Sequence, residues 1–266
     1  MTFHNKTIAI TGASSGIGAA CAALLKHRGA KVIGLDINEP APGSVDQFIA
    51  FNQGLLDSID QAVAQIPAGI DGLLNIAGVA PSPRFSPAAV LKINFFGLRY
   101  FTEKMIDKLN AGAAIVNMTS GTGAGWPTNV DNIKAFLALD RIEQVDGFVA
   151  EHGIGSDGLE NSAAYPFSKQ LLSVWTLKSS SCWKEQGIRI NAVAPAAVDT
   201  PIIGDFMSSF GEESAQRMKK FGAATPENIA LATVFLISDD AVWVNGVVLP
   251  VDGGAIAGGT LMKLGL

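Results

Sequence analysis

Tyr165 and Lys169 are the two residues of this sequence whose types and spacing could together move a proton. They lie four positions apart, so on a helix the two side chains would share one face, one turn apart. Pro166 fits such a helix only in its first turn, where the missing N–H does no harm. A phenol titrates at about pH 10 in water, and a nearby ammonium lowers its pKa toward neutrality. The pair is therefore a candidate general acid and base; the alternative is a surface tyrosine and lysine on an ordinary helix.

A glycine-rich segment near the N-terminus predicts a dinucleotide site. Residues 7–11 form a short β-branched apolar run, which is typical of a buried parallel strand. Gly12, Gly16 and Gly18 follow it, and then an alanine- and leucine-rich helix that ends at Gly29. Glycines let the backbone approach a pyrophosphate, and the helix N-terminus offers free N–H groups and the positive end of its dipole. The position of these glycines between a strand and a helix favours a bound dinucleotide.

Asp36 ends the second predicted strand, at residues 31–35. An acidic residue at this strand tip is placed to accept a hydrogen bond from a ribose 2′-OH, and it would repel a 2′-phosphate. No arginine or lysine lies within residues 12–18 or directly after Asp36. The sequence therefore favours NAD(H) over NADP(H), and the alternative is that Asp36 is a turn or cap residue.

Strands and helices alternate along the whole chain. Further strands are predicted at residues 47–52, 72–78, 113–118, 188–193 and 246–254, and helices at 57–65, 91–109, 165–186 and 226–236. This order predicts an α/β fold, a single doubly wound Rossmann-type domain over residues 1–266 with a parallel sheet of about seven strands flanked by helices. Ligands bind outside the carboxyl ends of such strands, where Asn75, Ser120 and residues 195–200 are expected. Asn94 stands among apolar neighbours on a helix and needs a buried polar partner.

Two segments interrupt this alternation. Residues 121–160 are expected to form an inserted helical flap, with a glycine-rich loop at 121–126, an amphipathic helix at 132–150 and a flexible piece at 153–158. Residues 200–222 are expected to cover a site, with Phe206, Met207 and Phe210 on a helix. An apolar pocket between this covering segment and Trp126 and Pro127 of the flap would suit a bulky ketone or secondary alcohol.

Composition restricts the class of protein. The 266 residues are 48% hydrophobic and 16% charged, which provides a sizeable core and argues against disorder. The net charge of −5 disfavours a nucleic acid or an anionic membrane as partner. Cys21 and Cys182 are far apart in sequence and predict no disulfide, and no metal site is expected. Neither a signal peptide nor an apolar run of about 20 residues is visible. A soluble, cytoplasmic protein is therefore expected.

Over essentially its whole length the sequence resembles the short-chain dehydrogenase/reductase family. The motifs that carry the resemblance are Thr11-Gly12-x-x-x-Gly16-x-Gly18, Asn75-x-Ala77-Gly78, Asn94, Ser120, Tyr165-x-x-x-Lys169, Asn191 and Val251-Asp252-Gly253-Gly254. The resemblance implies that Tyr165 is the general acid and base, and that Lys169 lowers its pKa and holds the nicotinamide ribose. It also implies that Ser120 donates to the substrate oxygen and that Asn94 anchors a water that carries protons to Lys169.

The resemblance also implies a set of cofactor contacts. NAD is expected to contact Gly12, Ser14, Ser15, Gly16, Ile17, Gly18, Asp36, Leu55, Asn75, Ala77, Gly78, Tyr165, Lys169, Pro195, Val198 and Thr200. Hydride would then pass between nicotinamide C4 and a substrate carbon while Tyr165 exchanges a proton with the oxygen. Ser120 and Tyr165 would form the polar clamp on that oxygen, where charge develops.

Three departures from the family pattern stand out. Gly54 occupies the place of an aspartate that usually binds adenine, so that contact would be made by backbone or be absent. Pro195-Ala196 replaces a Pro-Gly pair. The gap between Ser120 and Tyr165 is unusually long, which resembles the bacterial 3α-hydroxysteroid dehydrogenase/carbonyl reductases. In that subgroup the insertion alters the usual helix–helix assembly surface, so the resemblance implies a homodimer, or otherwise the family's common homotetramer.

The expected activity is the interconversion of a secondary alcohol and a ketone with NAD(H). A bulky apolar substrate is favoured, either a hydroxysteroid or an aromatic or alicyclic carbonyl compound. One alternative is a dehydrogenase of a small polyol, sugar or cyclic diol, because the pocket composition cannot choose between them. The alternative from another class is a non-catalytic NAD-binding sensor, against which the joint presence of Asn94, Ser120, Tyr165 and Lys169 counts.

Overall fold

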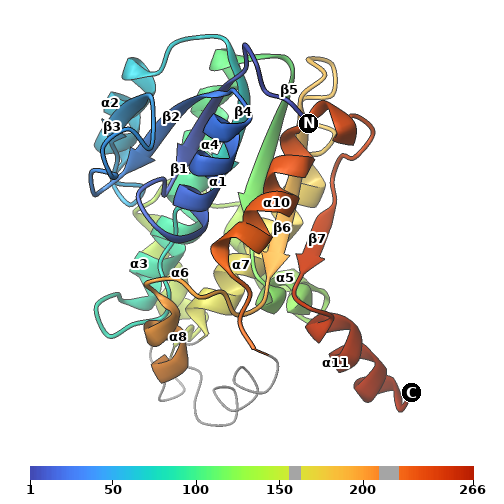
Figure 1. Cartoon of the computed structure of the whole chain (residues 1–266). Helices are drawn as coiled ribbons and strands as arrows, with labels where there is room; N and C mark the ends of the chain where they lie inside the picture. Colours follow the sequence, from blue (N-terminus) through green and yellow to red (C-terminus); the bar gives the residue numbers. More distant parts are fainter. Residues whose placement is uncertain (156–162, 210–221) are drawn as a thin grey trace.

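The computed structural model describes residues 1–155, 163–209 and 222–266. In these residues a seven-stranded sheet runs in the order β3-β2-β1-β4-β5-β6-β7, with every neighbouring pair parallel. This arrangement, visible in Figure 1, confirms the predicted fold class. The chain reverses its direction of sheet growth between β1 and β4, which defines the topological switch point. The strands are β1 (Thr7–Thr11), β2 (Lys31–Asp36), β3 (Gln47–Ala50), β4 (Ile70–Asn75), β5 (Leu109–Met118), β6 (Arg189–Pro195) and β7 (Val248–Val251).

Helices cover both faces of the sheet and bury a separate apolar core on each face. On one face, α1 (Gly16–His27) and α10 (Pro226–Ile237) pack on each other and on the sheet. The helices on the other face share the second core. They are α2 (Leu56–Gln65), α3 (Pro87–Leu91), the π-helix η1 (Lys92–Gly97), α4 (Leu98–Met105), α5 (Val130–Leu137), α6 (Gln144–Glu151) and α7 (Ala164–Ser179).

The long helix expected at residues 91–109 is four shorter pieces. Pro87, expected in a loop, begins α3, and the π-helix η1 separates α3 from α4. A 3-10 turn, η2 (Ile106–Lys108), then leads into β5, which begins at Leu109. Sequence periodicity did not predict the π-turn. The loop at Gln53, which is distant in sequence, packs against this π-helix at Gly97.

The insertion is two helices, although one amphipathic helix was predicted at 132–150. α5 and α6 flank a turn, and a 3-10 helix, η3 (Gly121–Thr128), replaces the predicted loop before them. Phe136 of α5 and Phe148 of α6 lie edge to face at 4.9 Å between ring centroids. Phe136 also packs edge to face on Phe167 of α7, at 5.8 Å. The insertion is therefore part of the main core, and the predicted flexible piece at 153–158 falls partly outside the described residues.

Several predicted boundaries were wrong. α7 ends at Ser179, and Gly187 lies in the turn before β6 with φ of 72°. Asp57 and Ser58 do not cap α2, which begins at Leu56; the Ser58 hydroxyl instead accepts a hydrogen bond from the Asn52 N–H. β3 and β4 end earlier than predicted. β5 begins earlier than predicted, at Leu109, and β6 ends later, at Pro195.

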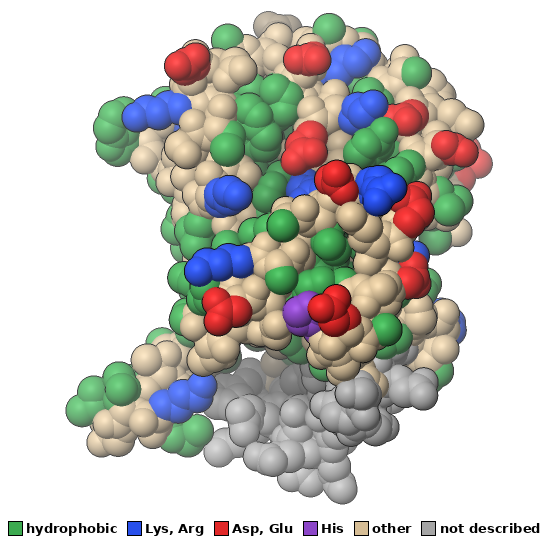
Figure 2. All heavy atoms as spheres, turned by 180° about the vertical axis from the view of Figure 1, so that it is seen from behind, with side chains coloured by type: hydrophobic (Ala, Val, Ile, Leu, Met, Phe, Trp, Pro, Cys, Tyr) green, Lys and Arg blue, Asp and Glu red, His purple; other side chains and the backbone are tan. Residues whose placement is uncertain are grey.

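The C-terminal helix α11 (Ala255–Leu264) was not predicted. It follows Gly253 and Gly254, both with positive φ, and it projects away from the body of the protein (Figures 1 and 2). Its side chains all belong to the described part of the chain, and none of them is buried. Among the described residues, no helix has both the length and the apolar character that crossing a membrane requires.

Candidate active site

The first two turns of α7 position Tyr165 and Lys169. α7 begins at Ala164, so Tyr165 and Pro166 lie in its first turn, as predicted. The Lys169 Nζ atom lies 5.5 Å from the centroid of the Tyr165 ring and donates a hydrogen bond to the Met118 carbonyl at 2.9 Å. The two side chains are 7% and 5% exposed. The surface alternative for this pair is therefore wrong, because both residues are buried beside the end of β5.

Burial controls the titration of both groups. It raises the pKa of the Tyr165 phenol well above its usual range, although a hydrogen bond with Ser120 acts in the opposite direction. Burial also lowers the pKa of the Lys169 ammonium to about 8. Both shifts have the same physical cause, because a charged group loses its hydration when it is buried. The ammonium of Lys169 also donates to the Met118 carbonyl. The role of Lys169 in lowering the tyrosine pKa stays a prediction.

Ser120 sits where β5 ends and η3 begins. Its hydroxyl accepts a hydrogen bond from the Thr122 N–H at 3.3 Å, and it is also hydrogen-bonded with Tyr165. Gly123 lets η3 pack closely on α7, because a Cβ there would lie 2.6 Å from the Ser173 hydroxyl oxygen. Sequence reasoning missed this contact, although the run of glycines after Ser120 was its signal. The structure thus brings Ser120 to Tyr165 as predicted.

Thr119 was also missed. Its hydroxyl donates to the Lys169 carbonyl at 3.0 Å and lies 3.0 Å from the Ser173 hydroxyl. It therefore anchors the turn of α7 that carries the candidate lysine to the end of β5. A threonine directly before the candidate serine was the only available sequence signal.

Asn94 lies in the π-helix and is 1% exposed. Its side-chain amide exchanges two hydrogen bonds with the backbone of Val79, at 2.8 and 2.9 Å, which supplies the polar partner that its position requires. Its amide nitrogen also lies 3.4 Å from the Ser168 hydroxyl. The Cβ position of Gly78 would lie 3.1 Å from the Asn94 Oδ1 atom and 3.8 Å from the Lys169 Nζ atom. Asn94 and the Lys169 ammonium therefore both lie beside Gly78, in the turn that follows β4.

The glycine loop has the close contacts that a dinucleotide site needs. Gly12 and Gly16 have φ of 73° and 53°, a backbone conformation that favours glycine. A Cβ on Gly18 would lie 1.9 Å from the Gly12 carbonyl oxygen. A Cβ on Gly16 would lie 3.1 Å from Thr200, so the loops after β1 and β6 adjoin. The backbone here is bare enough for the close approach of a pyrophosphate, so these residues fit a dinucleotide.

Asp36 lies beside this loop at the end of β2. Its carboxylate accepts hydrogen bonds from the Ser14 and Asn38 N–H groups, both at 3.0 Å. The carboxylate is thus held at the glycine loop, where an adenosine ribose would have to lie. Asp36 therefore accepts a hydrogen bond within its own turn and also lies at the glycine loop. A role as a turn residue is compatible with a role in binding the ribose.

The other predicted cofactor residues differ in their exposure. Asn75 is fully buried, and its amide nitrogen donates to the Thr102 hydroxyl and to the Asn117 Oδ1 atom, at 2.9 and 2.8 Å. The nitrogen of its side chain therefore joins β4 to β5 and α4, while its Oδ1 atom is buried and accepts no hydrogen bond from the described residues. Leu55 is 56% exposed at the start of α2. Four more lie at strand ends or helix starts on the same edge of the sheet: Ser15, Ile17, Ala77 and Pro195. Val198 lies in the loop after β6, is 8% exposed and forms an isolated β-bridge with Ala224.

The covering segment begins with α8 (Ile203–Ser209). The Phe206 ring packs edge to face on Tyr165, with 4.9 Å between the ring centroids. An ion pair between Arg84 and Asp205 joins α8 to the loop that precedes α3. The side chain of Met207 and all of Phe210 lie outside the described residues. Phe206 of this segment therefore lies against the candidate tyrosine, and the covering role of residues 200–222 stays a prediction.

The flap contributes differently from the prediction. Trp126 lines an apolar groove between α5 and α7, together with Val130, Ile133 and Val174, and this groove does not include Tyr165.

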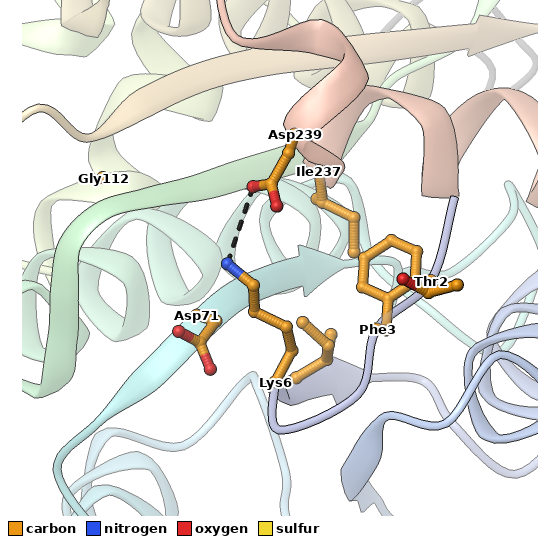
Figure 3. A pocket seen from close by; sticks show the side chains of 8 residues that line it. Thr2, Phe3, Lys6, Asp71, Gly112, Ile237 and Asp239 are labelled. Carbon is orange, nitrogen blue, oxygen red and sulfur yellow. Dashed lines mark ion pairs between the residues drawn. The ribbon is translucent and has the colours of Figure 1, made fainter.

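A second small pocket, drawn in Figure 3, lies at the opposite edge of the sheet, before β1 and at the start of β4. There Lys6 and Asp239 form an ion pair at 3.5 Å. Within the described residues, no cluster of three or more potential metal ligands occurs.

Comparison with known proteins places these features in context. Residues 6–130 match the family model described as short chain dehydrogenase, and residues 149–255 match a model described as enoyl-(acyl carrier protein) reductase. The chain is 34% identical to coniferyl-alcohol dehydrogenase of Pseudomonas sp. (strain HR199 / DSM 7063), over 96% of this chain and 98% of that protein. It is 28% identical to 3-alpha-hydroxysteroid dehydrogenase/carbonyl reductase of Comamonas testosteroni, over 93% and 95%.

A similar fold is found among solved structures. The crystal structure of 3-alpha-hydroxysteroid dehydrogenase from Pseudomonas sp. B-0831, complexed with NADH, superimposes with a TM-score of 0.80 at 26% identity. The match covers 98% of this chain and 100% of that chain. Levodione reductase gives a TM-score of 0.74 at 25% identity, over 96% and 99%.

Proposed function

The chain belongs to the short-chain dehydrogenase/reductase family, and we propose that it is an NAD(H)-dependent oxidoreductase that interconverts an alcohol and a carbonyl compound. One observation carries this proposal: Ser120, Tyr165 and Lys169 converge at the edge of the sheet where the glycine loop lies. A hydroxyl donor, a phenol and an ammonium at one place can bind a carbonyl or alcohol oxygen and exchange a proton with it while hydride is transferred at the carbon.

Each residue has a role that follows from its contacts. Tyr165 exchanges a proton with the substrate oxygen, and Ser120, hydrogen-bonded with it, orients that oxygen and stabilises charge on it. The Lys169 ammonium donates a hydrogen bond to the Met118 carbonyl and lies close to the Tyr165 ring, so its positive charge is next to the phenol. Asn94, at the Gly78 turn beside Lys169, is proposed to hold a proton-carrying water. When bound, NAD(H) supplies the hydride acceptor or donor.

We propose NAD(H) as the cofactor, in preference to NADP(H). The glycine loop and Asp36 would hold the pyrophosphate and the adenosine ribose, with Thr200 and the Val198 backbone nearer the nicotinamide. The support comes from the carboxylate of Asp36, which is held at the loop by the Ser14 N–H. A fixed negative charge there disfavours a 2′-phosphate. The NADH-bound relative supports a nicotinamide dinucleotide in general.

The proposed substrate is a bulky, apolar, ring-containing alcohol or ketone, such as a hydroxysteroid or an aromatic or alicyclic carbonyl compound. Phe206 against Tyr165 gives the approach to the phenol an aromatic wall. The names of the relatives include coniferyl alcohol, a hydroxysteroid and cyclohexanol, all of which carry rings. Coniferyl alcohol is a primary alcohol, so the secondary alcohol predicted from the sequence is one option of two. A small polyol, sugar or cyclic diol remains the alternative substrate class.

The proposed assembly is a homodimer or homotetramer in the cytoplasm, with neither nucleic acid nor membrane as partner. Trp243 is 97% exposed, and α11 carries exposed apolar side chains such as Met262 and Leu264. Such surfaces are typical of contacts between protein chains. The unpaired Cys21 and Cys182 suit a reducing compartment. Light scattering coupled to size exclusion would give the mass in solution, and a monomer at working concentration would contradict the proposal.

The decisive experiment measures NADH formation from NAD+ with a panel of alcohols, with NADP+ beside it. The panel spans 3α-hydroxysteroids, aryl alcohols both primary and secondary, cyclohexanols, cyclic diols and sugars. Tyr165→Phe should abolish turnover and leave NADH binding intact, because it removes only the exchangeable proton. Tyr100→Phe is the matched control, since the Tyr100 hydroxyl hydrogen-bonds to Asp60 on an exposed surface. Silence of the wild type across the panel, with tight NADH binding, would favour the sensor; turnover by Tyr165→Phe would contradict the acid and base role.

A further inference from the structure

We propose that Gln53 is a positioning residue, which holds the π-helix that carries Asn94 against the turn beside Lys169. The inference rests on the proposed oxidoreductase function. Gln53 lies in the loop between β3 and α2, outside the candidate catalytic set. Among the hydrogen bonds of the described residues, its side chain has none to Tyr165 or Ser120, so it would act only through other residues.

The amide nitrogen of Gln53 joins two segments that are far apart in sequence. It donates to the Ala77 carbonyl at 3.2 Å and to the Ile93 carbonyl at 2.8 Å. Gln53 is 4% exposed, so these two bonds are shielded from water. An amide nitrogen has two protons, and both are used here. The side chain therefore forms a bridge between the turn after β4 and the first turn of the π-helix.

The backbone of Gln53 makes a second contact with the same helix. A Cβ on Gly97, the last residue of η1, would lie 1.8 Å from the Gln53 carbonyl oxygen. Only a residue without a side chain allows the loop to approach this closely. A Cβ on Gly54 would lie 3.0 Å from Ile93. The loop thus packs along the π-helix with both its backbone and its side chain, and π-turns of this kind are frequent at functional sites.

The two bridged carbonyls belong to residues directly before the groups that flank the candidate lysine. Ala77 precedes Gly78, and Ile93 precedes Asn94. The Cβ position of Gly78 would lie 3.1 Å from the Asn94 Oδ1 atom and 3.8 Å from the Lys169 Nζ atom. The Gln53 bridge therefore fixes Asn94 relative to the Gly78 turn, beside which Nζ lies.

The Gln53 Oε1 atom strengthens this interpretation. It is buried, and no group of the described residues donates a hydrogen bond to it. A buried acceptor without a partner is unfavourable, and an apolar side chain of similar size would avoid that cost. The favourable contribution of this glutamine therefore comes from its nitrogen, which is the atom that makes the bridge.

The test compares Gln53→Leu with Gln65→Leu, which removes an exposed glutamine amide from α2 of the same protein. The alcohol and NAD+ that give turnover in the panel are used to measure kcat and KM, and NADH fluorescence gives the Kd. Because the bridge positions the proton-carrying groups, kcat should fall by about 10-fold to 100-fold in Gln53→Leu. KM and the NADH Kd should change by less than about threefold. Gln65→Leu should match the wild type.

Amide hydrogen exchange provides a readout that does not depend on turnover. Peptides that cover residues 92–98 should exchange about tenfold faster in Gln53→Leu than in Gln65→Leu, because the π-turn loses its bridge. An unchanged kcat, or unchanged exchange in these peptides, would overturn the proposal. A loss of NADH affinity with unchanged kcat would overturn it in favour of a cofactor contact. Should Gln53→Leu fail to fold, Gln53→Met takes its place with the same criteria. Wild-type inactivity on every alcohol would refute the proposed function, whereas unchanged exchange would refute the bridge alone.

Discussion

Replacing Lys169 with methionine tests whether burial governs the titration of the candidate site. Lys169 is 5% exposed, and burial lowers the pKa of its ammonium from 10.5 to about 8. In the unfolded chain this pKa has its ordinary value. Between the two values the unfolded state binds more protons than the native state, so the free energy of unfolding rises with pH. The destabilising effect of Lys169 is therefore fully present below pH 8 and is lost toward pH 10.5.

The size of this effect follows from the two pKa values. Their separation corresponds to about 3 kcal/mol of destabilisation at neutral pH. Wild type should gain about 2 kcal/mol relative to Lys169→Met between about pH 7 and pH 9.5. Burial also raises the pKa of the Cys21 thiol to about 12, which makes stability fall with pH above the ordinary thiol range. That contribution is common to both proteins, so it cancels in their difference.

The assay is equilibrium unfolding in urea at several pH values without cofactor, at one protein concentration. Lys178→Met is the matched control, because Lys178 is an exposed lysine on the same helix. Loss of the hydrogen bond to the Met118 carbonyl lowers the stability of Lys169→Met by a constant amount and leaves the pH slope unaffected. A wild-type minus Lys169→Met difference that stays constant over this pH range would refute the argument that burial depresses the ammonium pKa.

Asp36, Phe136 and Tyr165 can each be tested by one measurement. Asp36→Ala should weaken NAD+ binding by about tenfold and reduce the preference over NADP+, because a charged acceptor is lost at the glycine loop; unchanged affinity in a fluorescence titration would contradict the ribose role. Phe136→Ala should lower the free energy of unfolding by about 3–5 kcal/mol in one cooperative transition, since Phe136 is fully buried between the insertion and α7; a separate early transition would show an independent insertion. Alcohol oxidation should increase with pH, and carbonyl reduction should decrease, because burial raises the Tyr165 pKa and so disfavours the phenolate that oxidation needs; identical pH–rate profiles would contradict this.

The sheet and its ligand-binding edge could be predicted because both depend on local patterns. Apolar β-branched runs followed by small or polar residues mark the ends of parallel strands. Once those ends share an edge, Gly16 and Thr200, far apart in sequence, must come together, as the structure confirms. The tyrosine–lysine spacing likewise needs only the helix that begins at Ala164.

The remaining features depend on contacts between distant segments. The π-turn at Asn94 ends at Gly97, against which the Gln53 loop packs closely, and no window of local sequence contains both segments. The two-helix insertion is settled by packing of Phe136 and Phe148 against α7, which one amphipathic pattern could not distinguish from a single helix. α11 was missed because Gly258 and Gly259 weaken its local helix preference.

Burial affects the titration of Tyr165 and Lys169 in a way that their spacing in the sequence does not show. The helical spacing of Tyr165 and Lys169 suggests a pair in water, where the ammonium would favour the phenolate. In the folded protein the Tyr165 ring packs on Phe206 and Lys169 lies against the end of β5, and burial shifts the pKa of each group in the direction that favours its neutral form. The attraction between the ammonium and a phenolate therefore acts against the cost of burying each charge. A tyrosine whose pKa is raised keeps its proton at neutral pH, which is the form that carbonyl reduction needs and that alcohol oxidation must first lose.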